Sequence, residues 1–221
     1  MKVKFFIAAA VLIAGSVSCI SLDNPDGDVY NAMVTVKSTE DNTVYFQLTD
    51  DQTLYPEGFR GYGKEVRALT QFTLLKENVD PRFDATVKLM WIDTIQTKKM
   101  LVLGEGENAD DIGTDPIDIY NDWMTCVEDG YFTMHVRSWC GFGASVPHSL
   151  NLVKVPSSEP YEIELRHNAN GDSNDVLNEG IMAFSLDGLP DTEGDTVKLK
   201  LKWTRLDGTK GEKEFDYRTR K

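Results

Sequence analysis

Apolar and polar residues alternate over most of this chain, which is the pattern that half-buried β-strands produce. Segments 34–37 and 44–48 alternate on either side of the polar turn 40–42 and predict a hairpin. Segments 66–74 and 85–91 alternate in the same way and predict two longer strands. This region has no segment with the spacing of an amphipathic helix, so its predicted elements are strands.

A further short strand is expected at residues 53–55, before a glycine-rich loop that covers residues 56–63. Five short strands with one long loop are typical of a small barrel of the oligonucleotide/oligosaccharide-binding (OB) type. An SH3-like barrel is the alternative that the same pattern allows. We therefore predict an OB-like barrel over residues 29–97.

The second half of the chain predicts more strands. Short apolar segments at 100–103 and 123–126 precede the turn Glu128-Asp129-Gly130, which leads into a strand whose apolar face runs from Phe132 to Cys140. Asp207-Gly208 connects the last two strands as a hairpin. The remaining strands are expected at residues 161–165, 181–186, 197–203 and 212–217. Such a series favours an antiparallel β-sandwich over residues 98–221, so the predicted fold class is all-β, a barrel followed by a sandwich.

The N-terminus has the three-part layout of a secretory signal: a basic start, an apolar run over residues 5–14 and small residues that end at Cys19. The apolar run is about half the length of a transmembrane helix. A cysteine directly after small residues is what lipoprotein signal peptidase recognises. We therefore predict a signal peptide over residues 1–18 and an acylated Cys19 followed by a flexible tether over 19–28. Ordinary secretion, with a free thiol at Cys19, is the alternative.

Acyl chains on Cys19 would give stable membrane attachment, and we expect an outer-membrane lipoprotein that faces either the periplasm or the cell surface. The formal net charge of the chain is −13, and loss of Lys2 and Lys4 with the signal makes the mature part more acidic. Such a field repels phosphate groups, so nucleic acid is not expected as a partner. We expect the protein to contact the membrane through the lipid anchor rather than through its acidic surface.

Three stretches of the mature chain have a distinctive sequence: FQLTDDQTLYP at 46–56, DDIGTDPIDI at 110–119 and IELRHNANGD at 163–172. They resemble the NigD-like lipoproteins of anaerobic Gram-negative bacteria, and the resemblance covers nearly all of the mature chain. It implies an N-terminal OB-like domain and a C-terminal β-sandwich. It implies no activity, ligand or catalytic residue. The family takes its name from a gene in a bacteriocin cluster, which makes self-protection an alternative function.

Two acidic loops, at residues 104–118 and 168–175, carry enough oxygen atoms to suggest calcium. Alignment of Gly171 with the glycine of an EF-hand loop puts Arg166 and Leu177 at positions that need carboxylates. We therefore expect turns rather than a metal site, and no cofactor.

Candidate catalytic residues are scattered. His135, His148 and His167 stand singly, without the spacing of a zinc motif. Residues 143–146 supply only the first half of a GxSxG elbow. We predict no catalytic residues, and a hydrolase whose site is assembled from distant residues is the alternative from another class.

Cys126 and Cys140 would meet an oxidising compartment after export. The Asp129-Gly130 turn puts Cys126 opposite Thr133, well short of Cys140, and both cysteines are assigned to the core face. We therefore expect two buried thiols rather than a disulfide.

The tryptophans are predicted from the same alternation. Trp91 and Trp203 are assigned to core positions, and Trp139 to the opposite face of its strand. A single exposed tryptophan is a weak sign of a sugar-binding platform.

One loop carries the residues that binding surfaces favour. Tyr55, Phe59, Arg60 and Tyr62 alternate with glycines, and aromatic rings and guanidinium groups give large contact areas. Loops on barrels often meet ligands, although one or two of these rings would instead plug the barrel mouth. The function predicted from the sequence is a membrane-anchored, non-catalytic binding or assembly lipoprotein of the cell envelope, with a protein or glycan partner.

Overall fold

The computed structural model describes residues 29–143, 146–156 and 158–220. The predicted signal peptide, Cys19 and the tether lie outside these residues. In the described part of the chain, every regular element is a strand except η1 (Ala109–Asp111), a single 3-10 turn. No helix in that part is both long and apolar enough to cross a membrane. The strands are β1 (Val29–Ser38), β2 (Val44–Gln47), β3 (Thr53–Pro56), β4 (Val66–Leu74), β5 (Ala85–Thr94), β6 (Thr97–Lys99), β7 (Leu101–Val102), β8 (Asp118–Ile119), β9 (Cys126–Glu128), β10 (Tyr131–Cys140), β11 (Ser149–Lys154), β12 (Glu162–Asn168), β13 (Val176–Ser185), β14 (Val197–Thr204) and β15 (Lys210–Tyr217).

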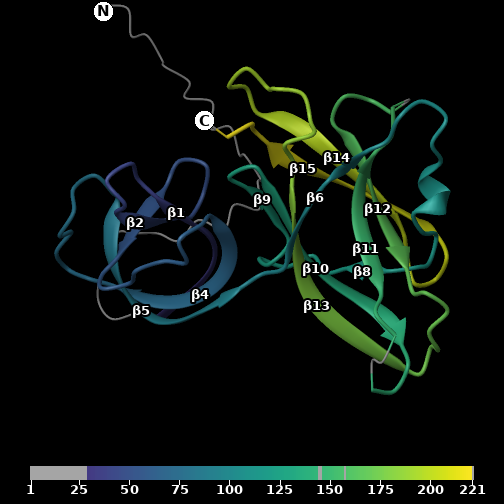
Figure 1. The fold of residues 1–221 in the computed structure, drawn as a ribbon, viewed down its shortest axis with the longest axis horizontal. Coiled ribbons are helices and arrows are strands. Elements are labelled where there is room, and N and C mark those ends of the chain that lie inside the picture. Colours follow the sequence, from purple (N-terminus) through teal and green to yellow (C-terminus); the bar gives the residue numbers. More distant parts are fainter. Residues whose placement is uncertain (1–28, 144–145, 157, 221) are drawn as a thin grey trace, which may run out of the picture.

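The first five strands close into a barrel in the order β1-β2-β3-β5-β4 (Figure 1). β1 pairs antiparallel with both β2 and β4, and β3 closes the barrel by pairing in parallel with β5. Alternate residues of each strand point inward, which is why the sequence shows a period of two. The buried core of the barrel consists of Ala32, Val34, Val36, Phe46, Leu48, Leu54, Ala68, Phe72, Leu74 and Val87.

The prediction that Trp91 lies in the barrel core is wrong, because the side chain of Trp91 is 38% exposed. Leu89 pairs with Phe72 of β4 but Trp91 pairs with Gln71, so Met90 is an extra residue between them. Such a β-bulge shifts the alternation by one position and turns Trp91 to the outside. Periodicity read from the sequence alone could not locate the bulge.

The second half of the chain forms two sheets packed face to face. One has the order β6-β13-β10-β8, with β9 also paired to β10, and the other has the order β15-β14-β12-β11-β7. Most pairs are antiparallel, but β14 runs parallel to β12, β7 to β11 and β6 to β13. Residues such as Phe132, Leu152 and Leu201 from both sheets form one core between them. The all-β prediction, a barrel followed by a sandwich, is confirmed.

β9 and β10 form the hairpin predicted at Asp129-Gly130, with φ of 52° and 72° at these two residues. Positive φ at both positions is the geometry of a type I′ turn. Cys126 does pair with Thr133, as expected. The strand predicted at 123–126 is wrong, however, since β9 begins only at Cys126. Trp123 lies in a turn before β9. The Asp122 carboxylate stabilises this turn by accepting a hydrogen bond from the backbone nitrogen of Met124 over 3.0 Å.

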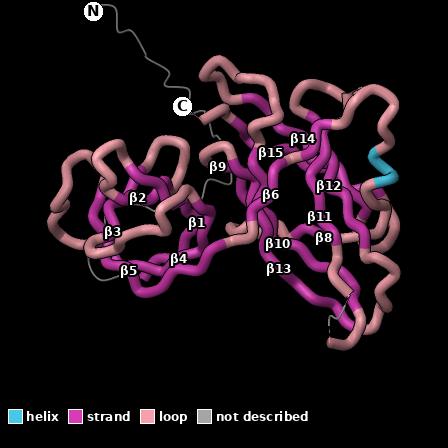
Figure 2. Tube along the Cα trace, viewed as in Figure 1, coloured by secondary structure: helices cyan, strands magenta, loops and turns pink. Residues whose placement is uncertain are grey.

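The barrel and the sandwich lie side by side, and the chain crosses from β5 to β6 through residues 95–96 (Figure 2). The C-terminal residues return to the barrel, where Arg218 reaches Asp51 over 2.5 Å and Arg220 reaches Glu65 over 2.5 Å. The crossover segment and the C-terminal residues therefore both link the domains.

Candidate functional site

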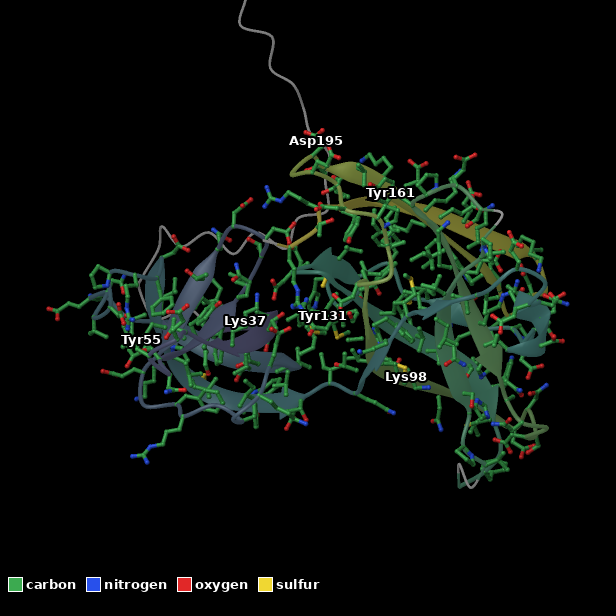
Figure 3. The ribbon with its side chains drawn as sticks, turned by 45° about the horizontal axis from the view of Figure 1, so that its top comes forward. Lys37, Tyr55, Lys98, Tyr131, Tyr161 and Asp195 are labelled. Carbon is green, nitrogen blue, oxygen red and sulfur yellow. The ribbon has the colours of Figure 1, made fainter. Side chains whose placement is uncertain are left out.

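The four residues of the predicted binding loop do not form one surface. Phe59 packs against the barrel core, with its ring centroid 5.7 Å from that of Phe46 and 5.6 Å from that of Tyr62. Arg60 is exposed in the loop beside it. Tyr55 belongs to β3 and lies on the side of the barrel away from the sandwich (Figure 3).

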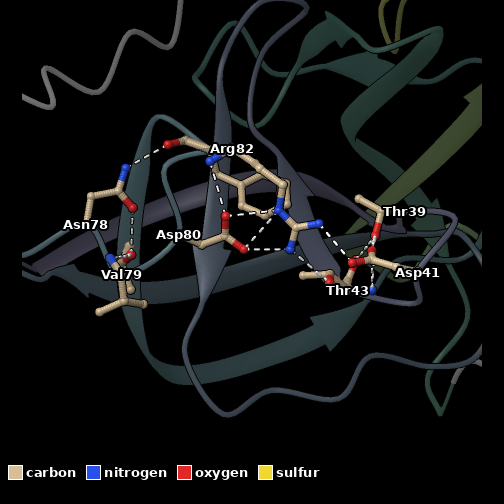
Figure 4. A network of polar contacts seen from close by, with 9 residues as sticks. Thr39, Asp41, Thr43, Asn78, Val79, Asp80 and Arg82 are labelled. Atoms are coloured by element: carbon tan, nitrogen blue, oxygen red, sulfur yellow. Dashed lines mark hydrogen bonds and ion pairs between the residues drawn. The ribbon is translucent and has the colours of Figure 1, made fainter.

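The outer face of β2 and β3 is covered by the chain itself. Phe83 is 7% exposed and stacks on Tyr45 and Tyr55, with centroid distances of 5.2 and 6.0 Å. Next to it, Arg82 reaches Asp80 over 2.7 Å and Asp41 over 3.0 Å (Figure 4). In OB folds this face and its adjoining loops contact oligomeric ligands. Here a segment between β4 and β5 covers that face.

The junction of the two domains contains a fully buried arginine. Arg67 of β4 donates hydrogen bonds to Thr35 of β1 over 3.1 Å and to Thr133 of β10 over 3.0 Å. Its remaining terminal nitrogen lies 3.5 Å from the Cys126 sulfur. A buried guanidinium needs such acceptors, because an unpaired donor away from water costs about 1–3 kcal/mol.

Carboxylates from both domains meet beside this arginine. Asp129 pairs with Lys37 over 2.7 Å, and its backbone nitrogen donates to Asp50 over 2.7 Å. Glu128 accepts from the backbone nitrogen of Asp50 over 3.1 Å. Burial, together with the nearby charge of Asp50, raises the pKa of Glu128 to about 7. Figure 3 shows Lys37 and Tyr131 at this junction.

Tyr62 of the predicted loop lines a cavity of about 360 Å³ between the domains, together with Arg67 and Tyr131. The Tyr131 hydroxyl donates to Glu65 over 2.6 Å, and Glu65 also pairs with Arg220. These polar groups already bond to one another, so the cavity wall is part of the domain junction.

Both described cysteines are free thiols, but they occupy different surroundings. Cys140 is buried, as predicted, and its sulfur lies 3.0 Å from the side-chain nitrogen of Asn178. The assignment of Cys126 to the sandwich core is wrong. Directly paired residues share a face, and Thr133 points toward the barrel, so Cys126 lies at the domain junction. Burial raises the pKa of its thiol.

A cleft of about 450 Å³ opens in the sheet where β12 and β14 diverge. Their parallel pairing ends at Glu164 and Lys202. Beyond that point residues 113–117 enter between them: the backbone nitrogen of Asp115 donates to the His167 carbonyl over 2.9 Å, and that of Ile117 donates to the Thr204 carbonyl over 2.8 Å. We call residues 113–117 the wedge segment. It lies next to η1, at the end of the sandwich away from the barrel (Figure 1).

Two glycines shape this cleft. A Cβ atom on Gly113 would lie 2.3 Å from the carbonyl oxygen of His167, so only glycine lets the wedge segment approach β12. A Cβ atom on Gly211 would lie 2.4 Å from the ring of Trp203, which packs between this strand and the sandwich core. The Trp203 indole nitrogen is buried without a hydrogen-bond partner among the described residues.

The remaining lining of the cleft is polar and of mixed charge. Arg166 pairs with Glu164 and, over 2.7 Å, with Asp110 of η1. Lys210 donates to Thr204 over 3.1 Å, and Glu212 is 56% exposed at the rim. A cavity of this size with an aromatic residue and convergent donors and acceptors has the general character of a ligand site.

Two histidines that stand apart in the sequence are brought together behind the cleft. His148 and His167 lie with ring nitrogens 3.0 Å apart. His148 contacts Asp172 over 3.2 Å, and His167 contacts the Pro116 carbonyl over 3.1 Å. The Gly141 backbone N–H keeps the pKa of Asp172 below its usual range, and burial lowers the pKa of His167. Nothing in the sequence indicates this pair, because His148 lies in the loop just before β11 and His167 lies on β12, and the pairing of these two strands brings them together.

The third histidine, His135, is separate from this pair. Its Nδ1 atom lies 2.7 Å from Asp122, and its ring stacks on Tyr120 with a centroid distance of 4.2 Å. Within residues 29–143, 146–156 and 158–220, no serine or cysteine side chain is hydrogen-bonded to a histidine ring.

The carboxylates of the acidic loops act as acceptors for nearby groups. Glu107 accepts from the Gly104 backbone nitrogen over 2.6 Å, and Asp115 accepts from that of Ala169 over 2.7 Å. Asp118 pairs with Arg137 over 3.1 Å. No group of three or more potential metal ligands converges within the described residues.

Comparisons with known proteins give the family. The NigD-like N-terminal OB domain matches residues 33–95, and the NigD-like C-terminal beta sandwich domain matches residues 99–217. A search of curated proteins gave no match.

Among solved structures, a protein from Parabacteroides distasonis described as toxin related is 32% identical, with a TM-score of 0.71 over 87% of this chain and 94% of that one. A protein of unknown function from Bacteroides vulgatus is 23% identical, with a TM-score of 0.69 over 86% and 91%. A NigD-like immunity protein from Bacteroides caccae is 20% identical, with a TM-score of 0.58 over 86% and 98%. The barrel is thus an OB domain rather than an SH3-like one, and the chain belongs to the NigD-like family.

Proposed function

We propose that this protein is a non-catalytic binding lipoprotein of the bacterial cell envelope, anchored through acylated Cys19. The protein holds its ligand in the cleft between β12 and β14. The observation that carries the proposal is the cleft itself, about 450 Å³ in volume and lined by Trp203, Arg166 and Glu212. Ligand cavities commonly have this size and combine a ring with a few well-placed polar groups.

The mixed charge of the cleft favours a ligand that both donates and accepts hydrogen bonds, as a peptide segment or a glycan does. The wedge segment and β15 hold its walls through backbone bonds, so the cleft is largely formed before a ligand arrives. A preformed site loses less entropy on binding. The OB face, by contrast, is covered by Phe83.

Two variants on the same strand test the proposal. Glu212 and Glu214 both lie on the outer face of β15, but only Glu212 lines the cleft. Glu212→Trp should fill the cleft and abolish capture of the partner from detergent-solubilised envelopes. Glu214→Trp adds the same ring outside the cleft and should capture as the unchanged protein does. Equal capture by both variants would reject the cleft as the binding site.

Self-protection against a bacteriocin is the second candidate, and one observation favours it: a solved structure of the same fold is described as an immunity protein. Expression of this protein in a bacteriocin-sensitive strain would then raise survival on exposure to that bacteriocin. Survival equal to that of the empty strain would remove this candidate and leave the binding function standing.

A further inference from the structure

Behind the cleft, the Pro116 carbonyl, His167, His148 and Asp172 form a row of three contacts. Each contact needs one hydrogen atom between its two partners. The Pro116 carbonyl and the Asp172 carboxylate can only accept, so the ring nitrogens that face them, on His167 and His148, each carry a hydrogen. The contact between the two rings needs one more. The row is therefore complete with three hydrogens, which is one proton more than two neutral imidazoles hold.

A fourth hydrogen cannot be accommodated in this arrangement. It would point two N–H groups at each other across 3.0 Å and place two positive rings side by side. His148 has a carboxylate, that of Asp172, within 3.2 Å of its ring, whereas the His167 ring contacts the Pro116 carbonyl and His148, so a further positive charge is less well supported on His167. Burial and the adjacent His148 both hold the pKa of His167 below its usual range.

His167 is also the residue that holds the wedge segment against β12. Its backbone carbonyl accepts from Asp115, and its ring contacts the Pro116 carbonyl over 3.1 Å. The packing of Gly113 against the same carbonyl adds a third contact. The wedge segment forms one wall of the cleft, so the His167 ring bonds directly to that wall.

We propose that the His148–His167 pair is an acid-sensitive latch: it holds the wedge segment in place while it carries at most one extra proton, and it releases the segment when a second proton is added. This inference deepens the proposed function, since the latch would control access to the cleft. The latch itself can be tested without any ligand.

Other ionisable groups surround the pair. On the side between the sheets, Arg137, Cys140 and Glu179 share a cavity with both rings. On the cleft side, the groups that share a cavity with His167 are Asp115, Glu164, Arg166, Lys202, Lys210 and Glu212. Asp115 and Glu164 already accept hydrogen bonds from Ala169 and Arg166. None of these groups is hydrogen-bonded to either ring, and among the described residues the carboxylate that does contact the pair is that of Asp172.

The sign of the effect follows from the pKa of His167. Folding lowers this pKa, so the unfolded chain binds the proton more readily than the folded one. The contact of His167 with the Pro116 carbonyl needs only a neutral His167 ring, so it is kept above the ordinary histidine value of about 6.5 and weakens as the pH falls below it.

Hydrogen exchange at the amides of Asp115 and Ile117 measures the latch directly, because both bond across the wedge segment. After correction for the intrinsic exchange rate, their protection should fall by about tenfold between about pH 7.5 and about pH 5, which span the histidine range. The Leu48 amide, bonded within the barrel, should keep its protection.

Two variants complete the test. His148→Asn replaces the facing ring by an amide oxygen that can accept from a protonated His167, so the wedge amides should stay protected at both pH values. His135→Asn removes the histidine away from the wedge and should respond to pH as the unchanged protein does. If the original protein keeps the protection of the Asp115 and Ile117 amides at low pH, the latch is overturned. The latch is also overturned if His148→Asn loses as much protection at these amides as the original protein does. Neither result bears on whether the cleft binds a ligand.

Discussion

Arg67 of the barrel donates a hydrogen bond from Nε to the hydroxyl of Thr133 in the sandwich over 3.0 Å, and both side chains are fully buried. A charged group in such a place is held by every acceptor around it. The two domains thus share this buried polar contact in addition to the junction contacts of Lys37 with Asp129 and of Asp50 with Glu128 and Asp129.

Replacement of Arg67 by Ala should lower the free energy of unfolding by about 3 kcal/mol, because it leaves buried acceptors on Thr35 and Thr133 without a donor. Denaturant unfolding followed by tryptophan fluorescence measures this loss. Arg60→Ala, in the exposed loop, serves as the control and should change stability by less than about 0.5 kcal/mol. Equal effects of the two variants would show that the junction contributes little.

The stability of the protein should depend on the protonation of Glu128. Its pKa is raised to about 7 in the folded state from 4.5, so the folded chain holds the proton more tightly than the unfolded one. The contribution of Glu128 to the free energy of unfolding is on the order of 3 kcal/mol in total. It is fully present below about pH 4.5 and is lost as the pH rises through about 7.

Glu128→Gln tests this dependence, because the amide keeps an acceptor for the Asp50 backbone nitrogen and cannot ionise. Its melting temperature should match that of the unchanged protein near pH 4.5 and exceed it above pH 7. Identical profiles for the two proteins across this range would contradict the assignment.

Phe59 plugs the barrel in this structure, with its ring against Phe46. Phe59→Ala should therefore cost about 2 kcal/mol of stability, somewhat less than a fully buried phenylalanine. Thermal unfolding measures the loss. If the loop is a binding surface instead, Phe59→Ala together with Arg60→Ala will keep the melting temperature and lose the captured partner.

The predicted anchor is tested in cells. Cys19→Ala should move the protein from the membrane fraction to the soluble fraction, because the acyl chains provide the attachment. Cell fractionation followed by immunoblotting shows the distribution. Sedimentation of the variant with membranes would reject the lipid anchor.

Alternation in the sequence was enough to predict both domains, because each sheet has one buried face. It failed at Trp91, where a bulge reverses the alternation, and at Cys126, which faces the other domain rather than the core. The cleft depends on how β12 and β14 diverge, and the His148–His167 pair depends on the register of β11 and β12. Such relationships join residues far apart in the sequence, and local pattern does not encode them.

The Trp203 indole N–H provides the most direct test of the cleft as the ligand site, because it is buried beside the cleft and has no partner in the described structure. We would titrate the 15N-labelled protein with the partner recovered by capture and follow the indole signals. The Trp203 signal and the Leu165 amide should shift, while the signal of Trp91, on the barrel surface, should stay. Shifts confined to residues 57–63 or to Trp91, with Trp203 unmoved, would place the ligand on the barrel and contradict the account.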